Sequence, residues 1–283
     1  MNSDSTLLQG VKMVSLALNV PGPVAAARLT KLGAEVTKVE PPTGDAAKTA
    51  APALYESLCQ GQTVLRLDLK SPEGCAKLDE LLAQADLLLA SFRPSALQRL
   101  GLDWESLHAR HPKLCFVGII GYPAPLQERT GHDLTYQSDL GLLRPPQMPP
   151  TLFIDLAGAE RAVSMALALL NRVARGGESG CAWVSLHECA QDLAAPLKAG
   201  LTSSDGILGG AYPLYGFYRA NDGWIAIAAL EPHFGERLLA ELGLKKADRA
   251  ALERIFLQRK ATSWEKWAQE LDLPLVAVRD AGT

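Results

Sequence analysis

The first half of the chain alternates short apolar runs with longer amphipathic segments. The apolar runs cover residues 12–18, 34–40, 63–69, 86–92 and 113–121. Each run is short and bounded by polar or turn-forming residues, which is typical of a buried strand. Two segments between them, 21–33 and 71–85, predict helices, the second with Ser71 as its N-cap and Pro72 at its first position. Strands that alternate with helices favour crossover connections, so the pattern predicts a Rossmann-like α/β domain, with a mostly parallel sheet and helices on both faces.

The second half of the chain has a different pattern. Residues 143–153 contain four prolines and predict a rigid loop. After that loop the pattern predicts a helix over 154–177, a strand and a helix over 182–198, a linker over 202–213, a hairpin over 212–230, two or three helices, and a strand over 274–278. The change in character near residue 200 indicates two domains. We expect a large domain over 1–200 and a smaller α+β domain over 201–283.

The composition argues against a polyanionic partner. Of the 283 residues, 48% are hydrophobic and 21% are charged, and the formal net charge is −3. This balance favours neither nucleic acid nor an anionic membrane as a partner. The N-terminus lacks the basic and apolar segments of a secretion signal, and no apolar run reaches membrane-spanning length, so we expect a cytoplasmic protein. The five cysteines are scattered without a CxxC pair, and we predict no metal site.

The usual nucleotide-binding motifs of this fold class are absent from the sequence. No GxGxxG follows the first predicted strand, and there is no GxxxxGK[ST] phosphate loop. Parallel sheets bind ligands at the carboxyl ends of their strands even without these motifs. The turn GPVAA at 22–26, which comes soon after the first predicted strand, is therefore a candidate ligand-binding segment.

Three groups suited to acid–base chemistry stand at predicted helix starts. They are the pair His132-Asp133, then Asp155, then Glu231, and each follows a glycine, a loop or a strand end. Two interpretations remain open for each group. The side chain either caps its helix and does nothing more, or it projects into a cleft where the helix N-terminus influences its charge. The residues alone therefore predict an α/β protein with candidate catalytic groups, but they do not specify a reaction.

Several segments, taken in order, resemble one protein family. LQGVKMVSLALNVPGPVAAARLTKLGAEVTKVEPPTGD, residues 8–45, is similar to the family's opening strand, its GP turn and its LGAEVIKVE-P-GD segment. The segments that follow in the family's order are DLKSPEG, ADLLLASFRPSALQRLGL, the GHD stretch, IDLAGAERAVSMALALLNR, LGGAYPLYGFYRANDGWIAIAALEPHF and LPLVAV. The chain resembles the family III CoA transferases, a group that includes the α-methylacyl-CoA racemases. The GHD and ALEPHF segments are more similar to the racemase branch.

This resemblance implies an enzyme that acts on an acyl-CoA thioester. It implies that His132 and Asp155 face opposite sides of the acyl α-carbon, with Glu231 assisting by orienting His132. Inversion of a carbon next to a thioester needs a base that removes the proton and an acid that returns it from the other face. The expected activity is therefore racemisation of a 2-methylacyl-CoA.

The resemblance also assigns residues to coenzyme A. Lys70, Arg93 and Arg99 would bind its phosphates, for which cations are suited, and Val20 and Pro21 would pack against the nucleotide. Coenzyme A would enter as part of the substrate, with no permanently bound cofactor. We further expect a homodimer, and we expect that the C-terminal segment that completes the large domain in typical members is missing here.

Two other functions remain open. In the transferase branch, the residue that matches Asp155 attacks the thioester and forms an acyl anhydride, from which CoA is passed to a carboxylic acid. His132 distinguishes the two enzymatic functions, because a racemase needs it and a transferase does not. The third function is that of a catalytically weak paralogue, which binds acyl-CoA or a partner protein without turnover.

Overall fold

The computed structural model describes residues 6–279 of the chain. The chain divides into two compact units, residues 1–193 and 194–283, which we describe separately. The division falls inside helix α9 (Leu186–Lys198). The predicted boundary between 1–200 and 201–283 lies just after this helix, and it stays a prediction.

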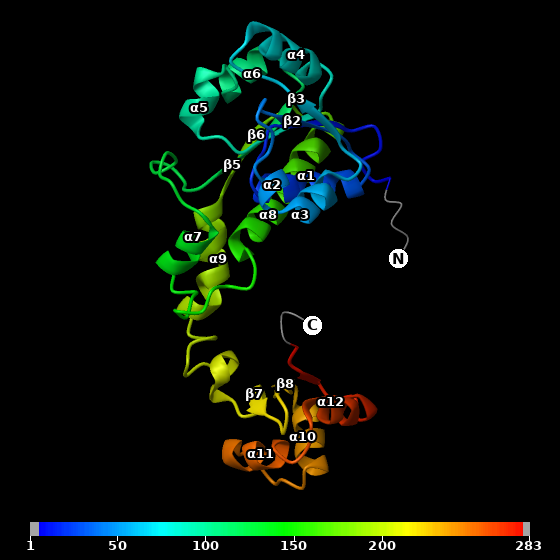
Figure 1. Ribbon diagram of the computed structural model, residues 1–283, viewed down its shortest axis with the longest axis vertical. Coiled ribbons are helices and arrows are strands. Elements are labelled where there is room, and N and C mark those ends of the chain that lie inside the picture. Colours follow the sequence, from blue (N-terminus) through cyan, green and yellow to red (C-terminus); the bar gives the residue numbers. More distant parts are fainter. Residues whose placement is uncertain (1–5, 280–283) are drawn as a thin grey trace. The chain divides into compact units, whose positions relative to one another are not determined.

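The first unit is built on a six-stranded sheet in which all neighbouring strands are parallel (Figure 1). The strands are β1 (Lys12–Ser15), β2 (Glu35–Glu40), β3 (Thr63–Arg66), β4 (Leu87–Ala90), β5 (Cys115–Ile120) and β6 (Cys181–Ser185). Their spatial order is β3-β2-β1-β4-β5-β6, so the direction of winding reverses between β1 and β4. Ligands of open parallel sheets bind at such a switch point, outside the carboxyl ends of the strands.

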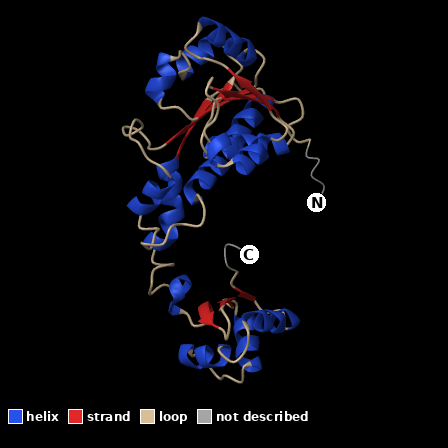
Figure 2. Ribbon diagram, viewed as in Figure 1, coloured by secondary structure: helices blue, strands red, loops and turns tan. Residues whose placement is uncertain are grey.

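Helices cover both faces of this sheet, as Figure 2 shows. One face packs against α1 (Pro21–Lys31) and α8 (Phe153–Ala174), and the other against α4 (Pro72–Leu82), α5 (Pro94–Arg99) and α6 (Trp104–Arg110). Successive side chains of β1 point to opposite faces, so Met13 lies in the first core and Val14 in the second. The predicted Rossmann-like α/β architecture is confirmed.

The predictions hold for the strands and the long helices of the first unit, but they miss several short helices. Ser71 caps α4, where its hydroxyl accepts a hydrogen bond from the Gly74 N–H at 3.0 Å. The unpredicted helices are α2 (Ala47–Ala50), α3 (Pro52–Cys59), α5 and α6. None of these exceeds eight residues, so the helical period has few positions in which to repeat.

A buried charge cluster fixes the loop that follows β2. The Lys38 ammonium lies 2.7 Å from an Asp45 oxygen and 3.0 Å from a Glu40 oxygen, and all three side chains are almost fully buried. The Tyr55 hydroxyl, on α3, donates a hydrogen bond to Glu40 at 2.8 Å. Buried charges need such partners, because leaving one unpaired in the interior is strongly unfavourable. This cluster explains why β2 carries the charged residues Lys38 and Glu40 at buried positions.

The second unit is a small three-stranded sheet covered by helices. The strands β7 (Tyr215–Arg219), β8 (Trp224–Ala228) and β9 (Leu275–Ala277) pair antiparallel in that order. The helices are α10 (Pro232–Glu241), α11 (Arg249–Phe256) and α12 (Ala261–Glu270). Their core includes Tyr218, Ile225 and Trp264. The predicted hairpin, the following helices and the terminal strand are all confirmed.

A close contact between β1 and α1 sets the position of the first helix at the switch point. Gly22, near the start of α1, is buried, and a Cβ atom there would overlap with the Cβ atom of Ala17. Only glycine lets the two backbones approach to this distance. The GP turn therefore places the start of α1 directly beside the end of β1.

We predict that Gly22→Ala lowers the free energy of unfolding by about 1–3 kcal/mol, because the added methyl group overpacks this contact. Urea denaturation followed by circular dichroism measures the change. Gly223→Ala is the control, since its Cβ atom would meet Ala261 at an ordinary 3.9 Å. Equal stability of Gly22→Ala and the wild type would contradict the close contact.

Candidate active site

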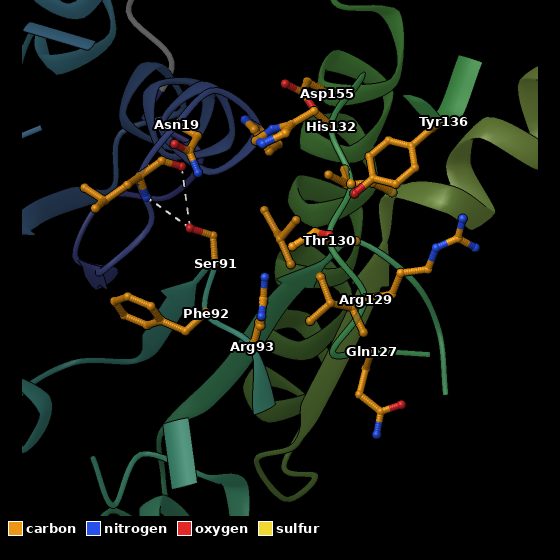
Figure 3. Close-up of a pocket in the computed structure, with 17 residues that line it drawn as sticks. Asn19, Ser91, Phe92, Arg93, Gln127, Arg129, Thr130, His132, Tyr136 and Asp155 are labelled. Carbon is orange, nitrogen blue, oxygen red and sulfur yellow. Dashed lines mark hydrogen bonds between the residues drawn. The ribbon is translucent and has the colours of Figure 1, made fainter. Parts of the chain in front are cut away.

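A cavity of about 220 Å³ lies at the switch point of the sheet (Figure 3). Three loops supply most of its lining: the β1–α1 loop, the β4–α5 loop and the loop that leads from β5 into α7 (Asp133–Asp139). The lining includes four residues predicted from the sequence, namely Pro21, Arg93, His132 and Asp155. Residues far apart in the chain thus meet at the edge of the sheet where the topology favours a ligand.

Hydrogen bonds join the β1–α1 loop to the β4–α5 loop on one wall of the cavity. The Leu18 N–H donates a hydrogen bond to the Ser91 hydroxyl at 3.0 Å, and the same hydroxyl donates to the Leu18 carbonyl at 3.5 Å. Figure 3 shows Ser91 and Asn19 on this wall. Asn19 adopts a left-handed backbone with φ of 66°, which asparagine tolerates better than most residues do. These contacts hold the mouth of the cavity in one shape.

His132 stands at the N-cap position of α7. Its backbone N–H donates to the Thr135 hydroxyl at 3.0 Å, and that hydroxyl donates to the His132 carbonyl at 2.8 Å. The side chain is exposed and lines the cavity. The backbone of His132 is therefore fixed by the helix start, while its imidazole stays accessible to a ligand.

Asp133 caps a helix, but the helix is not its own. One of its carboxylate oxygens accepts hydrogen bonds from the N–H groups of Ile154 at 2.7 Å and Asp155 at 3.0 Å, in the first turn of α8. Gln137 donates to the other oxygen. The side chain is buried, and it satisfies backbone donors that the N-cap residue of α8, Leu152, leaves without a side-chain acceptor. Asp133 therefore joins α7 to α8 and holds the backbone of Asp155.

Asp155 has a different environment from Asp133. Burial raises the pKa of its carboxyl from the usual 3.8 to about 6, and the negative charge of Asp133 adds to the rise. The two neighbouring carboxyl groups thus differ: Asp133 accepts hydrogen bonds from Ile154, Asp155 and Gln137, whereas Asp155 has a pKa raised towards neutral pH. Such a difference is typical of acid–base sites.

Three further predicted residues of the first unit lie outside the lining of this cavity. Lys70 lines a neighbouring cavity of about 200 Å³, which shares Leu18 and Phe92 with the first cavity. Val20 is the half-buried N-cap residue of α1, and Arg99 is exposed on α5. Their proposed contacts with CoA stay predictions.

Glu231 belongs to the second unit, where it is the N-cap residue of α10 and is exposed. An exposed carboxylate at a helix N-terminus is stabilised by the helix dipole. Its assistance to His132 stays a prediction from the resemblance.

Sequence reasoning missed Tyr136, which is fully buried against the cavity. Its hydroxyl has no hydrogen-bond partner within residues 6–279, and burial raises its pKa to about 12. Gly121 and Gly131 make room for it, since a Cβ atom at either would lie 2.6 Å or 2.5 Å from the tyrosine ring or hydroxyl. Gly131, the first residue of the GHD stretch, and Gly121, just after β5, were the available signal, because glycine often marks a close approach of another group.

In the described part of the chain, no helix is both long enough and apolar enough to cross a membrane. Nor are three or more His, Cys, Asp or Glu side chains of residues 6–279 grouped as metal ligands would be.

We predict that Asp155→Asn stabilises the fold at neutral pH by about 1–2 kcal/mol. The folded state binds the Asp155 proton more tightly than the unfolded state does, since its pKa is raised from 3.8 to about 6. Stability from this group is therefore present below pH 4 and is lost as pH rises to about 6. Urea denaturation at pH 4 and pH 7.5 tests this: the advantage of Asp155→Asn should appear only at pH 7.5. The exposed Asp205→Asn should show no such difference.

The chain resembles known proteins over most of its length. The model of CoA-transferase family III matches residues 8–283. Human α-methylacyl-CoA racemase is 32% identical over 84% of this chain and 65% of the racemase. Cinnamoyl-CoA:phenyllactate CoA-transferase of Clostridium sporogenes is 29% identical over 86% of this chain and 66% of the transferase. The crystal structure of a Mycobacterium tuberculosis hypothetical protein has a TM-score of 0.85 at 25% identity, covering 96% of this chain and 85% of that one.

The match spans just under two thirds of the length of the racemase and of the transferase. Because an isomerase and a transferase are similar to this chain at comparable identity, they do not decide between the two reactions. The names of both relatives refer to CoA thioesters. This agrees with the family that the opening strand, the GHD stretch and the later segments resemble. The chain belongs to CoA-transferase family III.

Proposed function

We propose that this protein racemises the α-carbon of a 2-methylacyl-CoA, with His132 and Asp155 as the two proton-transfer groups. The observation that carries this proposal is that both side chains line one cavity at the switch point. They come from the starts of two different helices, and Figure 3 shows them at the same end of the cavity. A substrate carbon held between them would have one group on each side.

The chemistry needs each group in both protonation states during a full cycle. A carboxyl with a pKa of about 6 is mostly ionised at pH 7, so Asp155 accepts a proton from the α-carbon, yet it also returns one readily. Histidine is the commonest side chain for such transfers. Asp133 would keep Asp155 in place while the proton moves, because it holds the backbone N–H of Asp155.

Coenzyme A would lie along the carboxyl edge of the sheet. The cavity beside Lys70 shares Leu18 and Phe92 with the cavity that holds Asp155, so one extended ligand can occupy both. We assign the nucleotide end to Lys70 and the thioester to Asp155, with Arg93 between phosphate and thioester. Val20, Pro21 and Arg99 keep the supporting roles that the resemblance implies. A homodimer and a cytoplasmic location remain predictions.

A CoA transferase is the second candidate, and the same Asp155 favours it. A carboxylate removed from water is a stronger nucleophile towards the thioester carbonyl. Its attack would form an acyl anhydride and release CoA as the thiolate. The thiolate would then attack the Asp155 carbonyl, which releases the first carboxylate and leaves an Asp155–CoA thioester. An acceptor carboxylate would attack this thioester to form a second anhydride, and the CoA thiolate set free would attack the acceptor's carbonyl, which yields the new CoA thioester and restores the Asp155 carboxylate. This route does not use His132.

We predict α-proton exchange when the protein is incubated with a 2-methylacyl-CoA in D2O. His132→Ala and Asp155→Ala should each slow deuterium uptake, followed by mass spectrometry, by about 10²–10⁴-fold. His108→Ala on α6 and Glu160→Ala on α8 lie outside the cavity lining and serve as matched controls. Absence of uptake in the wild type, with Asp155-dependent transfer of CoA to an added acid, would replace the racemase by the transferase.

The pH dependence of exchange gives a separate prediction. For the isomer whose proton Asp155 removes, kcat/KM should rise about tenfold per pH unit up to pH 6 and then level off, because only the ionised carboxyl acts as a base. Mass spectrometry of samples quenched at set times, between pH 4.5 and 8, measures this profile. A rate that is constant from pH 4.5 to 6 would show that Asp155 is not the base.

A further inference from the structure

Three cavities follow one another along the carboxyl edge of the sheet. The cavity beside Lys70 and the cavity with His132 and Asp155 share Leu18 and Phe92. A third cavity, of about 330 Å³, continues the line beyond the ends of β5 and β6, and it shares Ile120 and Gln127 with the second. The cavity that holds the proposed catalytic groups therefore adjoins one further cavity at Leu18 and Phe92 and another at Ile120 and Gln127.

The third cavity is mainly apolar. Its apolar lining consists of Pro94, Ile120, Pro123, Ala124 and Trp183. The Trp183 ring packs on Gly118 of the neighbouring strand, where any Cβ atom would overlap with it, and meets the edge of Phe116 at a ring distance of 5.3 Å. Trp183 is 39% exposed, so this fixed ring presents part of its surface to the cavity.

The junction between the second and third cavities is polar. The Gln127 side-chain oxygen is buried there without a hydrogen-bond partner among the described residues. Figure 3 shows Gln127 at the end of the second cavity away from Asp155. A buried polar atom without a partner is unfavourable, and a bound ligand or an ordered water commonly satisfies it. A ligand that passes from the second cavity to the third would meet one polar group and then an apolar wall.

On the basis of the function proposed above, we propose that the acyl group of the CoA thioester occupies this third cavity. The nucleotide takes one end of the row, the thioester the middle, and the acyl group the other end. An engineered cavity of about 150 Å³ holds one benzene molecule, so a cavity of about 330 Å³ has room for roughly ten carbon atoms. The site would accept apolar acyl groups of up to about this size.

The charge of the lining sets the selectivity of this cavity. Glu188, in the first turn of α9, contributes a carboxyl group, and Ser185 a hydroxyl. Its lining within residues 6–279 includes no lysine, arginine or histidine. A terminal carboxylate, as in a succinyl group, would therefore meet a like charge and no counter-ion. The protein would select uncharged acyl groups over dicarboxylic ones.

Isothermal titration of the whole chain with CoA, 2-methyloctanoyl-CoA and succinyl-CoA tests this proposal without requiring turnover. The wild type should bind 2-methyloctanoyl-CoA at least about tenfold more tightly than CoA, and succinyl-CoA no more tightly than CoA. Ala124→Trp should remove the gain for 2-methyloctanoyl-CoA, because the new ring fills the cavity, and should leave CoA binding unchanged. Glu188→Lys should strengthen succinyl-CoA binding about tenfold.

Leu126→Trp is the matched control for Ala124→Trp. Leu126 is 50% exposed in the same loop and does not line the cavity, so this variant should retain the wild-type preference. Equal effects of the two tryptophans, or a succinyl-CoA affinity unchanged in Glu188→Lys, would overturn the proposal. Failure of the wild type to prefer any acyl-CoA over CoA would overturn it too. If the wild type binds 2-methyloctanoyl-CoA more tightly than CoA but shows no α-proton exchange, only the racemase function would be overturned.

Discussion

The candidate site depends on the hydrogen bonds that Asp133 accepts from the first turn of α8. Through the N–H groups of Ile154 and Asp155, this buried carboxylate joins the start of α7, where His132 stands, to the start of α8. Burial raises the pKa of the Asp155 carboxyl, and the negative charge of Asp133 beside it adds to the rise. The hydrogen bonds of Asp133 therefore set the geometry of the proposed proton-transfer pair, and its charge contributes to the raised pKa of Asp155.

The topology of the sheet supplies the space in which that pair can act. The winding reverses between β1 and β4, so the loops after these strands diverge and leave a crevice at their carboxyl ends. The close approach of Gly22 to Ala17, which leaves no room for a Cβ atom at Gly22, keeps α1 close to this edge, and the Ser91 hydroxyl joins the two loops through hydrogen bonds. The row of cavities thus follows from the order of the strands, and an extended thioester matches it better than a compact ligand would.

Much of the fold was predictable from the sequence because its signals are local. The six parallel strands stand out as short apolar runs, the long helices repeat an apolar period, and Ser71 caps its helix within four residues. The site was only partly predictable. His132 and Asp155 were found through their positions at helix starts and through resemblance, but Asp133 caps a helix 20 residues further along the chain, which no periodicity indicates. The buried Tyr136 and the junction residue Gln127 likewise depend on packing between distant segments.

The central claim is that Asp133 and Asp155 are a structural and a chemical carboxylate, respectively. Difference infrared spectroscopy of carboxyl titration tests it most directly, with Asp155→Asn used to identify the band. The account predicts a carboxyl that titrates near pH 6 in the wild type, is lost in Asp155→Asn, and titrates at lower pH in Asp133→Asn, where the neighbouring charge is gone. A band that titrates near pH 4 and is lost in Asp155→Asn would contradict the account.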